Sequence, residues 1–128
     1  MTVSDMYAIT CISHSAFREL LSEGLRTFEL RSAHNINSIA HVNLGEPVFV
    51  TCKAEEDITR ETEGIIAVIK AMSVQKKRID GQGDEYEISV VRIQLERVNT
   101  AKVKDAVHSD IGKEVSVDIE ARRFYRIS

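Results

Sequence analysis

Hydrophobic and polar positions alternate in several short segments, which predicts a chain built mainly of β-strands. The predicted strands span residues 6–12, 26–31, 48–52, 65–74, 86–98 and 115–119. The 65–74 run, which Gly64 opens, is rich in β-branched residues and almost continuously apolar. It therefore predicts a strand that is buried on both faces or that belongs to a closed barrel.

A helix is predicted between the first two strands. Apolar residues recur there at helical spacing: Phe17, Leu20 and Leu21. Ser13 or Ser15 can cap its first turn, because a hydroxyl accepts a hydrogen bond from an unpaired N–H group. Gly24 ends the helix, since glycine readily adopts the left-handed conformation found at many helix ends.

The remaining segments predict connections and a second helix. Residues 32–45 are rich in Ser, Asn and His, and we expect a long connection with one helical turn around 37–41. Residues 80–84 predict a turn that joins two strands into a hairpin. The apolar phase slips between Val90 and Val91, which predicts a β-bulge. Asn99 is expected to cap a short helix that runs through Val107, with Ala101, Val103 and Val107 facing inward.

The segment that follows Gly24 carries the most specific motif of the chain. It reads G-L-R-T-F-E-L-R, and Arg26 lies on the same predicted strand face as two apolar residues. Thr27, Glu29 and Arg31 lie on the opposite face. The segment resembles the G-x-K-T-x-E-x-R signature of the ASCH family, part of the PUA-like superfamily, with Arg26 in place of the lysine.

The resemblance to the ASCH family covers roughly residues 6–98. Two later segments, G-E-P-V-F-V and G-I-I-A-V-I, resemble the next barrel strands of that family. The resemblance implies an α+β fold, a small, mixed, partly open PUA-like β-barrel flanked by short helices. It also implies a cleft suited to RNA or a modified nucleoside, within a single domain that spans residues 1–128.

The resemblance points to five candidate binding residues. Arg26 and Arg31 can contact a phosphate or a base edge through their planar guanidinium groups. Thr27 can donate or accept one hydrogen bond, and Glu29 can accept one from an exocyclic amine or orient an arginine. Lys53 is expected to border the cleft. The alternative is that Glu29 and Arg31 simply pair across a strand surface.

Two other functions stay open at this point. Some members of the superfamily hydrolyse acetylated cytidine, using the lysine of the motif and a threonine that this chain replaces with Glu29. Because arginine stays protonated, Arg26 cannot act as a base, so an amidohydrolase or ribonuclease would need Glu29 as its general base. The third possibility is a protein-interaction domain on the same barrel.

Composition limits these functions further. The chain has 128 residues and a net charge of −3, which argues against strong non-specific adhesion to nucleic acid and favours the interaction domain. Aromatic residues make up 5% and tryptophan is absent, so a platform of several stacking rings is not expected. No apolar run approaches the length of a membrane helix and no secretory signal is visible, so we expect a cytoplasmic protein without a membrane partner.

The cysteines and histidines predict no separate chemistry. Cys11 and Cys52 lie in apolar, strand-like segments, and we expect buried, reduced thiols. A Cys–His pair has no local signature, and the histidines lack the spacing of a zinc site. Since phosphate-binding and dinucleotide-binding glycine motifs are also missing, we expect no metal and no cofactor.

Overall fold

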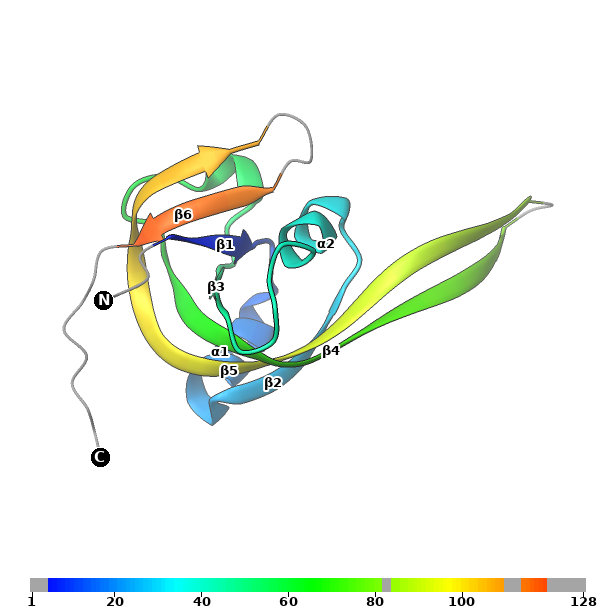
Figure 1. Ribbon diagram of the computed structural model, residues 1–128, viewed down its shortest axis with the longest axis horizontal. Helices are drawn as coiled ribbons and strands as arrows, with labels where there is room; N and C mark the ends of the chain where they lie inside the picture. The colour runs from blue at the N-terminus through cyan, green and yellow to red at the C-terminus, as the bar shows by residue number, and fades with distance from the viewer. Residues whose placement is uncertain (1–4, 82–83, 110–113, 120–128) are drawn as a thin grey trace.

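The computed structural model describes residues 5–81, 84–109 and 114–119, and it shows a mixed α+β fold that is mostly sheet (Figure 1). In chain order the elements are β1 (Asp5–Ile9), α1 (His14–Glu23), β2 (Leu25–Leu30), α2 (Ala33–Ile39), β3 (Pro47–Val50), the 3-10 turn η1 (Glu55–Asp57), β4 (Glu63–Gly81), β5 (Asp84–His108) and β6 (Val115–Ile119). The predicted fold class is thus confirmed at the level of α+β.

The strands form one sheet that curls into a ring. Their order is β2-β5-β4-β3-β1-β6, and an additional pairing of β5 with β6 closes the ring. The β1–β3 pair is parallel, whereas the other pairs are antiparallel. Because β2 adds to the sheet outside this closed circuit and β4 and β5 run on beyond it, the sheet is ring-like without being a regular barrel (Figure 1).

Register shifts bend the two longest strands around the ring. Lys70 of β4 and Val98 of β5 each lack a partner in the β4–β5 pairing, and Lys104 lacks one in the β5–β6 pairing. All three side chains are exposed. An extra residue in one strand increases local twist and bend, which lets β5 pair with β2 and β4 and then turn to meet β6.

Apolar residues pack on both sides of the central strands. One cluster lies with the helices and includes Leu20, Ile39, Val48 and Ile93. The second includes Ala8, Phe49, Ile66 and Val117. Residues 64–67 are buried without a break, so the prediction of a strand buried on both faces is confirmed there.

The capping residues of α1 behave as predicted. The Ser13 side chain accepts a hydrogen bond from the Ala16 N–H, and Gly24 ends the helix in the left-handed conformation with φ +81°. Arg97 of β5 also donates to the Leu21 carbonyl, which would otherwise lack a partner at the helix end. These contacts fix the angle at which α1 meets β2.

Beyond the body of the molecule, β4 and β5 continue as a two-stranded ribbon, which we call the arm (Figure 1). The pair Val74–Val91 is the last one that β2 joins, through Leu30. From there the two strands pair only with each other, out to Gly81 and Asp84. The predicted hairpin is confirmed, although residues 82–83 of its tip lie outside the described part of the chain.

The predicted helix from Asn99 to Val107 is wrong. This segment belongs to β5, where Ala101 pairs with Gly64 and the residues from Val103 onward pair with β6. Ala101 and Val103 are both buried, a spacing of two that places them on one face of a strand but on different sides of a helix. Two neighbouring strands supply hydrogen bonds along the whole segment, so tertiary pairing decides in favour of strand.

Two smaller expectations also change. No register shift separates Val90 and Val91, which pair with consecutive residues of β4 and are both buried, so that predicted bulge is wrong. The helical turn expected around 37–41 is instead α2, which begins at Ala33. The sequence also predicts that the last strand continues into residues 121–127, which lie outside the described residues.

Candidate functional site

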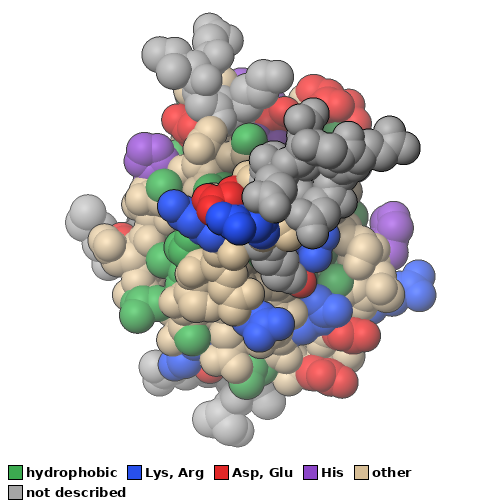
Figure 2. Space-filling model, turned by 90° about the vertical axis from the view of Figure 1, so that its right-hand side faces the viewer, with side chains coloured by type: hydrophobic (Ala, Val, Ile, Leu, Met, Phe, Trp, Pro, Cys, Tyr) green, Lys and Arg blue, Asp and Glu red, His purple; other side chains and the backbone are tan. Residues whose placement is uncertain are grey.

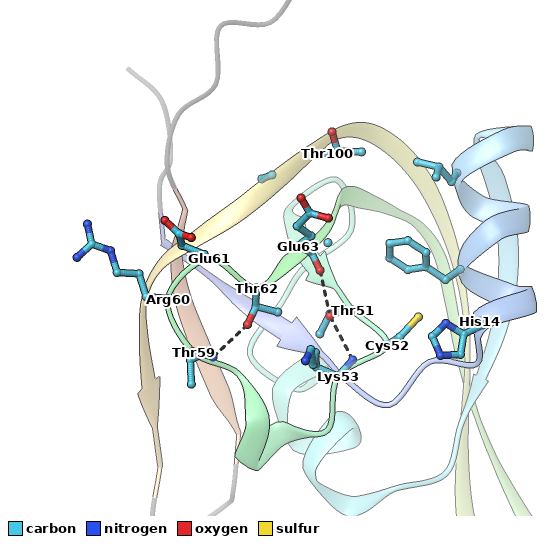
Figure 3. Close-up of a pocket in the computed structure, with 14 residues that line it drawn as sticks. His14, Thr51, Cys52, Lys53, Thr59, Arg60, Glu61, Thr62, Glu63 and Thr100 are labelled. Atoms are coloured by element: carbon cyan, nitrogen blue, oxygen red, sulfur yellow. Dashed lines mark hydrogen bonds between the residues drawn. The ribbon is translucent and has the colours of Figure 1, made fainter.

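An open cavity of about 900 Å³ lies between the start of α1, the end of β3 and the start of β4 (Figure 3). Its lining comes from α1, the connection between β3 and β4, and a short stretch of β5. The lining residues are His14, Phe17, Leu21, Thr51, Cys52, Lys53, Thr59, Arg60, Glu61, Thr62, Glu63, Gly64, Thr100 and Ala101. Cavities of this size can hold a small organic ligand.

Hydrogen bonds hold the β3–β4 connection in place around the cavity. The Thr51 hydroxyl donates to the Glu63 carbonyl at 3.2 Å and accepts from the Lys53 N–H at 3.3 Å (Figure 3). The Thr59 N–H donates to the Thr62 hydroxyl at 3.1 Å, and the Thr62 N–H donates back to the Thr59 carbonyl at 3.2 Å. This wall of the cavity is therefore a hydrogen-bonded turn, which can hold its side chains in place before a ligand binds.

Glu61 stands in the left-handed region at φ +73°, a conformation that non-glycine residues rarely adopt. Its N–H donates to the Val103 carbonyl at 2.7 Å, and the Val103 N–H donates to the Thr62 carbonyl at 2.9 Å. Bonds to β5 thus maintain the strained conformation. Such strain is concentrated at functional sites in proteins, so its position beside the cavity supports a functional role.

Gly64 lets the backbone of β4 approach β3 closely at the cavity. A Cβ atom at this position would clash with the Phe49 ring and with the Val50 carbonyl oxygen. Glycine is required here by contact rather than by its φ angle, which is unlike that of Gly24. The close approach sets the depth of the cavity between the two strands.

The cavity combines cationic, acidic, hydroxyl and apolar groups. Lys53 supplies an ammonium group from within the lining, whereas the Arg60 side chain points away from the other labelled residues (Figure 3). Glu63 forms a 3.8 Å ion pair with Lys102, and its side chain is 75% exposed. Phe17 is half-buried and offers a ring to the cavity. This combination suits a polar ligand with one flat face.

Among the five predicted binding residues, only Lys53, which lies outside the motif, lines this cavity. Arg26 lies on the side of β2 that faces α1, where its Nε donates to Glu19 Oε2 at 2.6 Å. Its guanidinium carbon also lies 4.9 Å from the centre of the Phe28 ring. Arg26 therefore links β2 to α1, and its charge is already paired.

Thr27, Glu29 and Arg31 are exposed on the other face of β2, as the alternation predicts. Arg31 Nη2 lies 3.3 Å from Glu29 Oε1, so the alternative of an ion pair along the strand surface is present. Register places Arg92 of β5 opposite Glu29. Figure 2 shows basic and acidic side chains interspersed on the face from which the arm projects. The structure thus does not bring the motif residues and Lys53 together.

Most of the cavity has no local signal in the sequence. Phe17 and Leu21 were assigned to the inner face of a helix, and the turn around Thr59 follows an acidic segment with no motif. The cavity arises because residues of α1 and of the segment that follows β3, far apart in the chain, line the same space. The only sequence signal for this cavity is the pattern of apolar positions, which leaves one face of the helix next to the end of a strand.

A hydroxyl, an imidazole and a carboxylate stand in a row near the end of β1. Thr10 Oγ1 lies 2.7 Å from His34 Nε2, and His34 Nδ1 lies 3.6 Å from Glu55 Oε2. This order of hydroxyl, imidazole and carboxylate resembles the catalytic triad of a hydrolase. Thr10 is only 1% exposed, however, and none of the three residues lines the cavity. We interpret the row as a structural connection between β1, α2 and η1.

A metal site and a catalytic thiol find little support in the described residues. Within the described ranges, no group of three or more His, Cys, Asp and Glu side chains could hold a metal ion. Burial raises the pKa of the Cys52 thiol, so only a small fraction of it is thiolate near neutral pH. No helix in the described part of the chain is long and apolar enough to cross a membrane.

Comparison with known proteins places the chain in a family. A family model described as "Protein of unknown function (DUF473)" matches residues 4–117. The chain is also 30% identical over 111 residues to an uncharacterized protein, MJ0105, of Methanocaldococcus jannaschii, which covers 85% of this chain and 72% of that protein. The chain belongs to the DUF473 family.

Proposed function

We propose that the chain is a binding module for RNA or a modified nucleoside and that its ligand occupies the cavity beside α1. In this proposal the ring of strands is a variant of the PUA-like barrel. The observation that supports it best is that one cavity presents an ammonium group, an aromatic ring and several hydroxyl groups. These are the groups that contact a phosphate, a base and a sugar.

Each group has a defined role in this proposal. The Phe17 ring offers a face on which a base can stack, and Lys53 offers a positive charge to a phosphate. The Thr51 and Thr62 hydroxyls are already engaged with backbone groups, so Thr100 is the hydroxyl we assign to a sugar. Glu63 can accept a hydrogen bond from an exocyclic amine.

The proposal concerns one or two nucleotides rather than a long strand. The net charge is −3, and the face shown in Figure 2 mixes both signs of charge, which does not favour a continuous phosphate track. An open cavity of about 900 Å³ instead suits a single nucleotide unit. Specificity would then come from the base that enters it.

The test is a binding titration with a labelled single-stranded RNA, followed by competition with nucleoside monophosphates. Lys53→Ala should weaken binding about 3- to 10-fold and reduce the salt dependence by about one phosphate contact. Phe17→Leu should weaken it about 10-fold, because stacking is lost while an apolar side chain remains. Circular dichroism would confirm that both variants fold.

Arg31→Ala is the matched control, because it removes one exposed positive charge outside the cavity. We expect it to bind like the wild type. If Arg31→Ala weakened binding and Lys53→Ala did not, the ligand would lie on the outer face of β2. No binding to RNA or to any nucleoside would contradict the module and leave the protein-interaction domain.

The hydrolase alternative has a separate assay. Glu29, its candidate general base, lies 3.3 Å from Arg31 on an exposed strand face, outside the cavity. We therefore expect no release of acetate from acetylcytidine. Release that disappears in Glu29→Ala would instead establish an enzyme.

A further inference from the structure

The two cysteines of the chain lie on neighbouring backbone segments beside the cavity. The Cys11 N–H donates to the Lys53 carbonyl at 2.9 Å, and the Ile12 N–H donates to the Thr51 carbonyl at 3.2 Å. Cys52 stands between those two acceptors in the sequence. Two segments 40 residues apart are therefore hydrogen-bonded to each other at their cysteines.

This spacing is compatible with a disulfide. Cys11 and Cys52 each lie two positions beyond Ile9–Val50, the last pair of the parallel β1–β3 ladder, and Cys11 turns away from the ladder at φ +58°. The hydrogen bonds on either side of Cys52 keep the two segments adjacent, and disulfides join Cα atoms about 4.4–6.8 Å apart. Both thiols are free, and Cys52 is half-buried, whereas the prediction of a buried thiol is wrong for Cys11, which is exposed because the chain has already left β1. Figure 3 shows the Cys52 side chain pointing toward His14, which lies three residues after Cys11 on the same segment.

We propose that Cys11 and Cys52 form a reversible disulfide when the protein meets a peroxide, and that this bond clips the wall of the cavity beside Lys53. Cys11, the exposed thiol, reacts first: its sulfur takes one oxygen from the peroxide to give a sulfenic acid, and the rest of the peroxide leaves as water or an alcohol. The Cys52 sulfur then attacks the Cys11 sulfur. An S–S bond forms, the S–O bond breaks and a second molecule of water leaves.

The environment of Cys52 predicts the pH dependence of this reaction. Burial raises the pKa of its thiol, so only a small fraction is thiolate near neutral pH. The second step should therefore become about tenfold faster for each unit of pH increase until that pKa is reached. A thiol reductant would reverse the bond.

The bond would change the cavity as well as the chain. Lys53 follows Cys52 directly and lines the cavity, and its carbonyl already accepts from Cys11. A covalent link would hold this part of the wall at a fixed distance from the segment that leads into α1. It would also close a loop of about 40 residues. For a domain of this size, such a cross-link should raise Tm by about 10 °C.

The test treats the folded, reduced protein with hydrogen peroxide and measures its intact mass. We expect a monomer lighter by two hydrogen atoms, and a non-reducing tryptic digest that links residues 1–18 to residues 32–53. Cys11→Ser and Cys52→Ser should each abolish the linked peptide, and dithiothreitol should restore the original mass. The oxidised monomer should melt at a higher temperature than the reduced one.

Several outcomes would overturn the proposal. Peroxide could give dimers linked through Cys11, a sulfinic acid on Cys11 with a free Cys52 thiol, or a linked peptide only in denaturant. Each would show that the two sulfurs do not meet in the folded chain. The mass measurement needs no ligand, so its result is independent of the nucleotide-binding proposal.

Discussion

Asn35 replaces a missing strand partner at the end of β1. Its Oδ1 accepts from the Thr10 N–H at 2.8 Å, and its Nδ2 donates to the Thr10 carbonyl at 2.9 Å. Asn35 is only 5% exposed and Thr10 only 1%. One amide side chain thus satisfies both backbone groups of a residue that has just left the sheet, as buried polar groups require.

Asn35→Ala should therefore lower the free energy of unfolding by about 2–4 kcal/mol, because it leaves a buried N–H and a buried carbonyl without partners. Urea unfolding followed by circular dichroism measures the change. Asn43→Ala is the control, since this asparagine is exposed, and it should change stability by less than about 0.5 kcal/mol. Equal losses in both variants would contradict this role of Asn35.

Gly64 makes a second prediction at the residue scale. Gly64→Ala should destabilise the protein by about 2–3 kcal/mol or more, because the added methyl group meets the Val50 carbonyl, which cannot move without shifting β3. Thermal unfolding compares it with Gly45→Ala, where nothing lies within 4 Å of the added methyl and only the positive φ of +84° opposes the change. A smaller loss at Gly64 than at Gly45 would show that β3 and β4 can separate easily.

Individual residues were predictable where the physics is local. Ser13 and Gly24 could be assigned as helix caps because capping depends on the adjacent backbone alone. The role of Arg26 could not be predicted, because its hydrogen bond to Glu19 depends on how α1 folds back against β2. The same limit applies to Asn35, whose partner lies 25 positions away.

At the scale of elements, the arm is the part of the sheet with the least support. Residues 75–81 and 84–90 pair only with each other, whereas residues 91–96 of β5 have β2 on one side and β4 on the other. Val74 is 65% exposed at the base of the arm. A ribbon of two strands without a covered face is marginally stable in water.

Hydrogen exchange should therefore divide β4 and β5 into two parts. We expect amides at 75–80 and 85–90 to exchange at least about 100-fold faster than the paired amides at 65–69 and 93–96, because the arm can open without disturbing the ring. Mass spectrometry of peptides from each part measures the difference. Uniform slow exchange along both strands would contradict it and would indicate that a partner covers the arm in solution.

The error over residues 99–107 also belongs to this scale. Ala101 and Val103 have the spacing of one strand face, and only the four-residue spacing of Val103 and Val107 fits a helix. Pairing with Glu63 and Gly64 on one side and with β6 on the other decided the conformation. Non-local hydrogen bonding of this kind leaves no trace in a single segment.

At the scale of the whole molecule, alternation alone predicted a sheet-rich α+β fold, and closure came from contacts that the sequence does not show. The β5–β6 pairing closes the ring, and the register shifts that bend β5 lie at Val98 and Lys104 rather than near Val90. The cavity depends on this closure, because its wall joins α1 to residues of β3, β4 and β5. The motif along β2 therefore contributes no residue to the cavity, and Lys53, predicted separately, is the one predicted binding residue that lines it.

The central claim is that the ligand enters the cavity beside α1. The most direct measurement is a nitrogen–proton NMR titration with cytidine monophosphate, recorded on the reduced protein. We predict that the amides of Thr51–Lys53, Thr59–Gly64 and Thr100–Ala101 shift, while those of Thr27–Arg31 stay in place. Shifts confined to β2 and the facing part of β5 would contradict the account, and so would a spectrum that does not change.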